Sequence, residues 1–191
     1  QTPLAQDLKV IEKHAVHCKR IVEDLLKFSR SSGTTRTRQD LNAILREVLA
    51  VLRSKFELER VQVVEHLAPD LPAIIVDGEK MKQVFMNLLM NARQAISPPG
   101  TITVRTMKDT GRRRVVASVQ DTGCGIAPEI LHRIFDPFFT TKPVGVGTGL
   151  GLSVSYGIVR DHDGEIRVDT SPGKGSTFVV ELPMESEGER P

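Results

Sequence analysis

The sequence contains no tryptophan and a single tyrosine, and aromatic residues make up only 4% of its 191 residues. So few aromatic rings argue against the stacking surfaces with which many proteins bind single-stranded nucleic acids or carbohydrates. The formal net charge is only +2, from 26 basic and 24 acidic residues. The basic run Arg112–Arg114 is too short to be a nucleic-acid binding surface and is interpreted as an exposed hairpin tip. We therefore expect no nucleic-acid partner.

Cysteine is also scarce. Cys18 and Cys124 lie far apart and show neither zinc-ligand spacing nor a disulfide framework. This usage indicates a reducing compartment, so we expect a cytoplasmic location. No apolar run approaches the roughly 20 residues of a membrane span, and no signal peptide is recognisable. We expect no membrane contact by this chain. Because Gln1 opens directly into a helical pattern, we also expect a fragment, and membrane anchoring of the full-length protein stays open.

A heptad pattern predicts a long helix over residues 1–31. Its seam consists of Leu4, Leu8, Ile11, Ala15, Cys18, Val22 and Leu25. Ile21, Leu26 and Phe28 widen the apolar face beyond a two-stranded seam. A face this wide favours packing in a bundle, with a partner helix or a second copy of the chain, over docking on the chain's own globular part. Residues 32–39 are predicted to be a linker, 40–184 a globular domain and 185–191 a polar tail.

The globular domain is predicted to be an α+β, two-layer α/β sandwich. Asp40 and Asp77 are suitable N-cap residues for two of its helices. We predict helices over about residues 40–56, 78–97, 128–134 and 150–160, and strands over Val61–Leu67, Ala73–Val76, Thr101–Met107, Val115–Asp121, Glu165–Asp169 and Thr177–Leu182. This order predicts one mixed or antiparallel sheet with the helices on one face.

A stripe of side-chain amides runs along the helix predicted over residues 78–97. Asn87 and Asn91 are four residues apart, so they share one face, and Gln83 and Gln94 extend it. Amide oxygens of this kind bind hard cations or form hydrogen bonds with a nucleotide. An ordinary exposed polar face is the alternative, and the stripe alone favours it.

Two glycine-rich segments are candidates for ligand contact. Asp121–Ile126 directly follows a strand, and its glycines permit close approach of the backbone to a ligand. Asp121 at the strand end is suited to accept a hydrogen bond from the exocyclic amine of adenine. Gly145–Leu152 opens a helix, where backbone N–H groups favour phosphate. It lacks the Gly-Lys-Ser/Thr of a Walker loop. A turn and a flexible linker are the alternatives.

The segment Ile134–Lys142 carries three of the seven phenylalanines in a region rich in Gly and Pro. Phenylalanines in such a loop are covered by a lid or presented to a partner. Thr140, Thr141 and Lys142 are suited to contact phosphate oxygens. Simple loop packing is the alternative.

Taken in order, these segments resemble the N box, first glycine box, F box and second glycine box of sensor histidine kinases, members of the Bergerat-type GHKL ATPase superfamily. They read Asn-Leu-Leu-Met-Asn-Ala from Asn87, Asp-Thr-Gly-Cys-Gly-Ile from Asp121, Phe-Asp-Pro-Phe-Phe-Thr-Thr-Lys from Phe135 and Gly-Thr-Gly-Leu-Gly-Leu from Gly147. Gly173–Phe178 resembles the last box. The resemblance covers about residues 40–183. The wording of these boxes is closest to the nitrogen-regulation and oxygen-sensing type.

The resemblance implies a Bergerat fold that binds ATP and Mg²⁺ beneath a lid over about residues 135–148. It implies that Asn91 binds the metal, that Asn87 supports the phosphates or metal, and that Asp121 binds adenine near Thr177. These two asparagines are its catalytic positions. The remaining implied nucleotide contacts are Gly123, Gly125 and Ile126 around the base, and Gly147, Thr148, Gly149, Leu150, Gly151 and Leu152 around the phosphates. Many family members have Lys where this chain has Gln94, and Arg93 or Lys142 is expected to compensate.

The predicted N-terminal helix resembles the second helix of the family's dimerisation hairpin. This implies a homodimer through that helix in the full-length protein and a response regulator receiver domain as partner. The phosphoacceptor box of the first hairpin helix is absent from the sequence. His14 and His17 lie on the second helix without the acceptor context, and His66, His132 and His162 lack it as well. The sequence therefore predicts a protein-histidine kinase module whose acceptor histidine lies outside this chain.

Two other functions remain possible. Hydrolytic relatives with the same pocket carry a glutamate where this chain has Asn87, and an amide cannot deprotonate water. This favours phosphoryl transfer over a GHKL-type ATPase. The other possibility is a nucleotide-binding regulatory or interaction module without catalysis, against which the intact boxes argue.

Overall fold

A computed structural model describes Leu8, Glu12, Ala15 and residues 35–143 and 147–185. The three isolated residues are helical. The rest of the helix predicted over residues 1–31, and of the tail predicted over 185–191 apart from Glu185, lies outside the described residues. The described structure is therefore essentially that of the globular domain.

The predicted helices and strands of this domain form, with boundaries shifted by a few residues at most. The helices are α2 (Leu41–Leu58), α3 (Gly78–Ala95), α4 (Pro128–Leu131) and α5 (Gly151–Asp161), and the strands are β2 (Val61–His66), β3 (Ile74–Val76), β4 (Gly100–Asp109), β5 (Arg114–Asp121), β6 (Glu165–Thr170) and β7 (Ser176–Pro183). Asp40 caps α2 by accepting from the N–H of Asn42, and Asp77 caps α3 by accepting from the N–H of Lys80. Both N-cap predictions are confirmed.

Five strands form a mixed sheet in the order β2-β4-β5-β7-β6. The β2–β4 pair is parallel and the other pairs are antiparallel. One strand was not predicted: β1 (Thr37–Gln39) lies inside the segment predicted as a linker and pairs with β3 in a separate two-stranded sheet. Its three polar residues carry no alternating apolar pattern, so the strand is defined only by its pairing partner.

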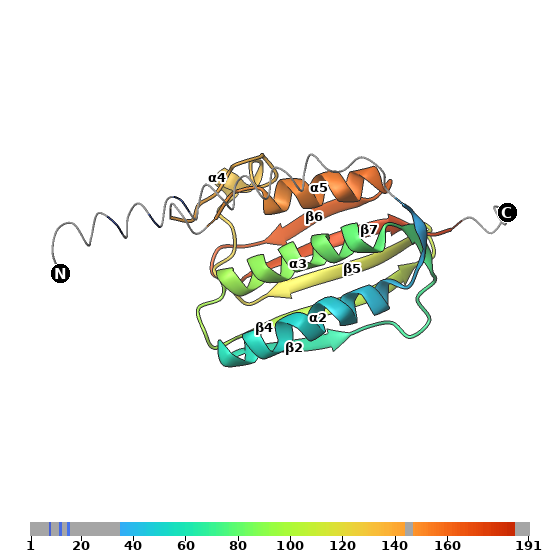
Figure 1. The fold of residues 1–191 in the computed structure, drawn as a ribbon, viewed down its shortest axis with the longest axis horizontal. Coiled ribbons are helices and arrows are strands. Elements are labelled where there is room, and N and C mark those ends of the chain that lie inside the picture. The colour runs from blue at the N-terminus through green and yellow to red at the C-terminus, as the bar shows by residue number, and fades with distance from the viewer. Residues whose placement is uncertain (1–7, 9–11, 13–14, 16–34, 144–146, 186–191) are drawn as a thin grey trace.

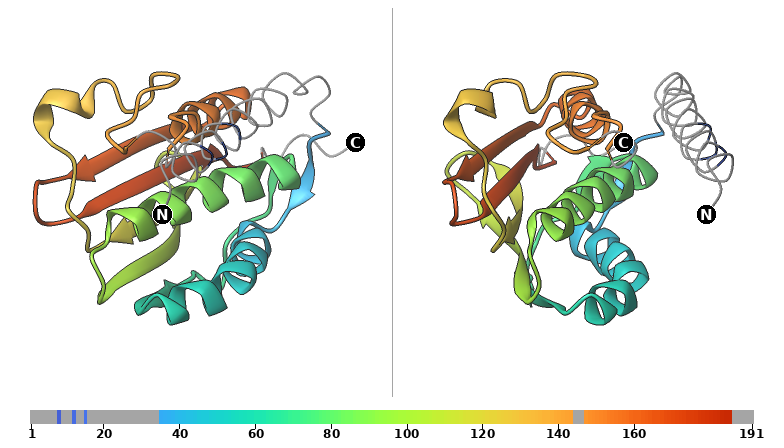
Figure 2. Two further views of the ribbon diagram at one scale, coloured as in Figure 1. Left: turned by 60° about the vertical axis from the view of Figure 1, so that its left-hand side comes forward. Right: turned by 90° about the vertical axis from the view of Figure 1, so that its left-hand side faces the viewer.

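Helices α2, α3 and α5 cover one face of the five-stranded sheet, as predicted (Figure 2). Their apolar stripes pack on the sheet because burial removes them from water. The largest fully buried side chains include Phe56, Phe85, Leu88, Ile102 and Leu182. Met81, Phe85, Leu88 and Ala92 anchor α3 to the core, which leaves its amide stripe on a different side of the helix.

The candidate residues gather at one end of the molecule. There α3 and β5 end, and the chain continues through α4 to the start of α5 (Figure 1). The turn between β6 and β7 reaches the same end, because Gly173 donates its N–H to the Cys124 carbonyl at 2.7 Å. The topology thus brings together segments that are up to about 90 residues apart in sequence.

Candidate functional site

Helix α3 contacts three different segments along its C-terminal half. Asn87 contacts the start of α5, and Asn91 and Gln94 contact Lys142 in the segment between α4 and α5. At the end of the helix, the Ala95 carbonyl accepts from the N–H of Cys124 at 3.0 Å. Successive helical turns therefore face the second glycine segment, the phenylalanine-rich segment and the first glycine segment in that order.

Asn87 is joined to α5 through its amide nitrogen. Nδ2 donates to the Gly151 carbonyl at 3.0 Å and to Ser155 Oγ at 3.2 Å. A backbone carbonyl only accepts, so the amino group and not the amide oxygen must face it. The opening of α5, where backbone N–H groups are left unpaired by the helix, is thereby held beside the amide stripe.

Lys142 brings a positive charge to the other end of the stripe. Its Nζ donates to Asn91 Oδ1 at 3.2 Å and also to Gln94 Oε1. Burial lowers the pKa of Lys142, because the charged form loses contact with water. The two amide oxygens carry no net charge and do not offset that cost. In the hydrogen bonds among the described residues, Lys142 meets amide oxygens and no carboxylate, so its ammonium group is suited to an anionic ligand.

Asp121 ends β5 in a nearly closed environment. It is 2% exposed, and its carboxylate accepts from the N–H of Gly123 at 2.8 Å and from the backbone N–H of Ser176. Burial raises the pKa of Asp121, and the two backbone donors oppose that shift. A buried carboxylate with spare acceptor capacity is suited to a neutral N–H donor such as an aromatic amine.

Three glycines allow the backbone segments around Asp121 to approach one another. A Cβ on Gly123 would lie 2.6 Å from the Ala95 carbonyl oxygen. At Gly125 (φ +70°) it would lie 2.1 Å from the Ser171 carbonyl oxygen, and at Gly175 (φ +83°) 1.9 Å from that of Asp121. Since any other residue would displace backbone, these positions require glycine.

The segment between α4 and α5 folds over the start of α5. Gly149 has φ +70°, and a Cβ there would meet the backbone of Phe138, which itself has φ +65°. Phe135 packs on Tyr156 of α5 with ring centroids 5.4 Å apart, whereas Phe138 is 57% exposed. The Arg133 guanidinium lies over the Phe139 ring at 4.5 Å. Phe138 is thus exposed to solvent, whereas Phe135 and Phe139 are packed against other side chains.

The other predicted residues lie around this centre. Ile126 and Leu152 pack against the core, and Leu150 is buried. Thr140 Oγ1 accepts from the N–H of Lys142 and lies where a Cβ on Gly147 would meet it. Thr177 lies on β7 opposite Gln120 of β5, one residue before Asp121, and Thr148 precedes Gly149 in the loop that leads to α5. Thr141 is exposed.

Two polar side chains at the site were not predicted. Thr170 Oγ1 accepts from the N–H of Ile126 at 3.0 Å and donates to the Gly175 carbonyl, which ties the first glycine segment to the β6–β7 turn. Ser155, fully buried on α5, contacts Asn87. Ser155 lies four residues after Gly151, so helical spacing places it one turn away, and this spacing was the available signal.

The three histidines of the described globular domain have different surroundings. His162 is buried, and both ring nitrogens are engaged: Nε2 accepts from the N–H of Asp77 at 3.0 Å, and Nδ1 faces the Ile158 carbonyl at 2.7 Å. A ring nitrogen whose lone pair already accepts a hydrogen bond inside the core cannot act as a nucleophile. His66 and His132 are exposed on other elements.

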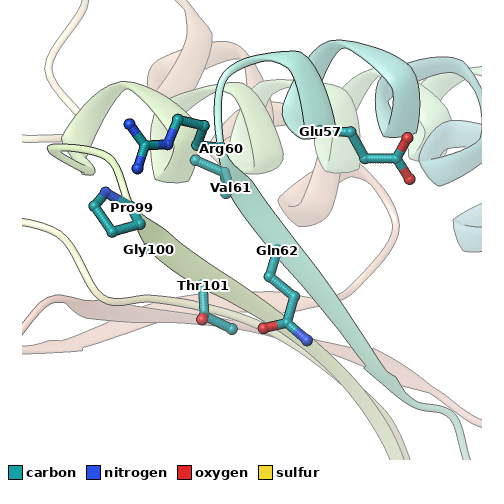
Figure 3. A pocket seen from close by; sticks show the side chains of 7 residues that line it. All are labelled: Glu57, Arg60, Val61, Gln62, Pro99, Gly100 and Thr101. Carbon is teal, nitrogen blue, oxygen red and sulfur yellow. The ribbon is translucent and has the colours of Figure 1, made fainter.

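Two surface hollows are lined by other residues. The one in Figure 3, about 620 Å³, is lined by Glu57, Arg60, Val61, Gln62, Pro99, Gly100 and Thr101. Another, about 530 Å³, lies between β1 and the starts of α2 and α3. Neither is lined by a predicted site residue, so the site is defined by converging contacts and not by either hollow.

The side chains present fit a hard cation that is shared with a ligand. No group of three or more His, Cys, Asp or Glu side chains forms a metal site within the described residues. The oxygens of Asn91 and Gln94 nevertheless converge on one ammonium group. Magnesium commonly takes only one or two protein oxygens and completes its shell with phosphates and water. Asn91 and Gln94 match that kind of incomplete site.

Comparison with known proteins identifies the class. Residues 76–186 match the family of histidine kinase-, DNA gyrase B-, and HSP90-like ATPases, and the chain belongs to this family. The match extends from Val76, the last residue of β3, past the end of β7 and includes every segment that converges on α3. The fold is accordingly the Bergerat fold that the sequence predicted.

Several of the similar proteins are named as histidine kinases. The chain is 38% identical to the signal transduction histidine-protein kinase AtoS of Escherichia coli, over 97% of this chain and 30% of that protein. It is 34% identical to sporulation kinase E of Bacillus subtilis, over 97% of this chain and 24% of that protein. The chain thus spans less than a third of the length of either relative.

Solved structures show the same class. The nucleotide-free catalytic domain of histidine kinase ThkA superposes with a TM-score of 0.70 at 32% identity, covering 78% of this chain and 95% of that one. ThkA in complex with the response regulator protein TrrA gives a TM-score of 0.78 at 27% identity, covering 99% and 54%. Among the described residues, no helix is long and apolar enough to cross a membrane.

Proposed function

We propose that this chain is the ATP-binding catalytic module of a protein-histidine kinase, which transfers the γ-phosphoryl group of ATP to a histidine outside the chain. The observation that carries the proposal is the convergence on α3 of two glycine segments and a lysine. Asn87 holds the start of α5, Asn91 and Gln94 hold Lys142, and Ala95 holds the segment after Asp121. One helix therefore lies between a buried carboxylate suited to adenine and a helix opening suited to phosphate.

Each part of ATP has a matching group. The Asp121 carboxylate accepts from the exocyclic amine of adenine, with Thr177 near it and with Gly123, Gly125 and Ile126 around the base. The backbone N–H groups of the loop and first turn that open α5, over residues 147–152, donate to phosphate oxygens. Thr140, Thr141 and Lys142 add donors from the segment over α5. A magnesium ion held by Asn91, with Gln94 beside it, would neutralise phosphate charge.

The surroundings of Asn87 favour transfer to a protein nucleophile over hydrolysis. Hydrolytic members of the superfamily need a general base at this position. Here the terminal group of residue 87 faces the Gly151 carbonyl and the Ser155 hydroxyl, whose proton is directed to the same carbonyl at 2.8 Å. A carboxylate here would be repelled by the Gly151 carbonyl, which only accepts, and could bond Ser155 only by drawing the hydroxyl proton away from that carbonyl. The position is therefore built for an amide, which cannot accept the proton of water.

The incoming nucleophile is a neutral imidazole, whose free lone pair needs no base. Its nitrogen forms a bond to the γ-phosphorus while the bond from that phosphorus to the bridging oxygen breaks, and ADP leaves with the bond electrons. The imidazole then releases its N–H proton to solvent. The groups around α3 position the triphosphate in line and neutralise its charge, which is the main requirement of phosphoryl transfer.

The finer assignments extend this proposal to the full-length protein. Residues 1–31 form the second helix of a dimerisation hairpin and join two copies. A response regulator receiver domain takes the phosphoryl group, and the complex of the similar kinase ThkA with the response regulator protein TrrA supports such a partner. The sequences of residues 121–126 and 135–142 support a sensor kinase of the nitrogen-regulation and oxygen-sensing type. The module acts in the cytoplasm.

Phosphoryl transfer in trans tests the proposal. The chain is mixed with Mg-ATP and with a separately produced phosphoacceptor helix from a related histidine kinase, and the acid-labile, base-stable phosphoprotein is measured. Formation of this product, lost with Asn91→Ala, supports a kinase. ATP hydrolysis without phosphoprotein would instead indicate an ATPase. Nucleotide binding without either reaction would indicate a regulatory module.

A further inference from the structure

Ser155 is a buried polar residue that belongs to none of the sequence motifs. It lies on α5 with no exposed surface, whereas its neighbours toward the outside of the helix, Ser153 and Tyr156, are partly or well exposed. Its Oγ lies 2.8 Å from the Gly151 carbonyl and 3.2 Å from Asn87 Nδ2. Burying a hydroxyl is unfavourable unless it is hydrogen-bonded, so these two contacts account for its presence in the interior.

The direction of both hydrogen bonds follows from the groups involved. The Gly151 carbonyl can only accept, so the Ser155 hydroxyl proton points toward it. The Ser155 oxygen then has only lone pairs to offer Asn87, which must present its amino group. Both neighbours of the Asn87 terminus are thus acceptors. Asn87 Oδ1 is therefore the atom of this amide that is turned away from both acceptors.

We propose that Ser155 is a positioning residue for nucleotide binding, which fixes the amide of Asn87 so that Oδ1 faces the phosphates and their cation. This inference rests on the proposed function, because it assumes that the phosphates lie between α3 and α5. An Asn amide can rotate by a half-turn and exchange its oxygen and nitrogen at little steric cost. The Gly151 carbonyl alone restrains that rotation with one hydrogen bond, and Ser155 adds the second.

The test compares two serine-to-alanine variants on the same helix. Ser155→Ala removes the hydroxyl that contacts Asn87. Ser153→Ala removes a hydroxyl that donates to the Leu150 carbonyl at 3.0 Å and does not touch Asn87, so it is the matched control. Binding of a non-hydrolysable ATP analogue with Mg²⁺, and separately of adenosine, is measured by calorimetry on the 191-residue chain. Thermal unfolding is measured for each variant.

Loss of one neutral hydrogen bond predicts that Ser155→Ala binds the magnesium nucleotide about 3- to 10-fold more weakly. Adenosine, which has no phosphates, should bind it as it binds the wild type, and Ser153→Ala should match the wild type with both ligands. A merely structural role would weaken adenosine binding as well. In an Asn87→Ala background, Ser155→Ala should have no further effect, because the residue it positions is gone.

Three results are distinguishable. If the wild type itself fails to bind the magnesium nucleotide, the proposed function fails and the inference fails with it. If the wild type binds but Ser155→Ala binds equally well, only the role of Ser155 is refuted. Additive effects of Ser155→Ala and Asn87→Ala would refute it too, because the serine would then act on binding by a route that bypasses Asn87.

Discussion

The sharpest prediction concerns Asp121, because a substitution there can change the charge of the side chain without changing its size. Asp121→Asn keeps the size of the side chain and removes its charge and half its acceptor capacity. The carboxylate is 2% exposed and already accepts from the backbone N–H groups of Gly123, at 2.8 Å, and Ser176. The proposed adenine amine is a third donor directed at the same group. All three are donors, so the substitution places an NH₂ group against at least one of them.

The magnitude follows from the number of hydrogen bonds lost. An asparagine can direct its one oxygen either to the backbone donors or to adenine, and its amino group then faces the other donor. Hydrogen bonds to a charged group contribute about 1.5–3 kcal/mol, and a buried donor left without an acceptor costs a similar amount. The predicted loss of nucleotide affinity is therefore about 10- to 150-fold.

The assay is calorimetric titration of the chain with a non-hydrolysable ATP analogue in the presence of Mg²⁺. Asp109→Asn is the matched control, because Asp109 Oδ1 also accepts from a backbone N–H, that of Arg112 at 3.0 Å. Asp109 ends β4 at the opposite end of the β4–β5 hairpin from Asp121. The control should bind like the wild type. If Asp121→Asn bound within about twofold of the wild type, adenine would not be recognised by this carboxylate, and the placement of the base would be wrong.

Three further predictions follow from the same geometry. Burial raises the pKa of Asp121, and only the ionised carboxylate accepts from all of its donors. As the pH is lowered, nucleotide affinity should therefore begin to fall at a higher pH than it would with an ordinary aspartate. Asp121→Asn should abolish this loss of affinity in acid. Lys142→Met should weaken ATP binding about tenfold by removing a charged donor, and Gln94→Lys in that background should restore part of the loss in the same titration. Gly175→Ala should lower the free energy of unfolding in urea by about 2–4 kcal/mol, because the left-handed backbone is strained and the Asp121 backbone is displaced. At Gly173 (φ +76°) a Cβ would meet nothing within 4 Å, so Gly173→Ala should lower it by the strain alone, about 1–2 kcal/mol.

Periodicity predicted the helices because each buries one apolar stripe. In α3 the residues Met81, Phe85 and Leu88 recur at helical spacing, and the amide stripe at Asn87 and Asn91 is what remains on another side. Strand order was beyond the same reasoning. The parallel pairing of β2 with β4 joins Val61 to Gly100, and no local pattern specifies that register.

The order of the motifs in the sequence predicts most of the site residues. The two residues that it does not predict are defined by tertiary contacts. Thr170 and Ser155 lie outside the quoted boxes, in a strand and a helix where they look like ordinary polar positions. Their roles appear only when the fold brings Thr170 to the N–H of Ile126 and Ser155 to Asn87, across 44 and 68 residues of sequence. Spacing can place Ser155 one helical turn from Gly151, but it does not show that the side chain is buried or that its partner lies on another helix.

The contact of Lys142 with Gln94 has a consequence for how nucleotide and loop are coupled. In the family members that carry Lys at the position of Gln94, the positive charge is fixed to a rigid helix. Here the helix offers an amide, and the charge arrives from the segment between α4 and α5, where burial lowers the pKa of Lys142. A triphosphate beside Nζ would reverse that shift, because a nearby negative charge favours the ammonium form. Nucleotide charge and the position of this segment are then linked through one side chain. A lysine at position 94 would be carried by the helix itself, which is why Gln94→Lys is expected to restore part of the affinity when Lys142 is replaced.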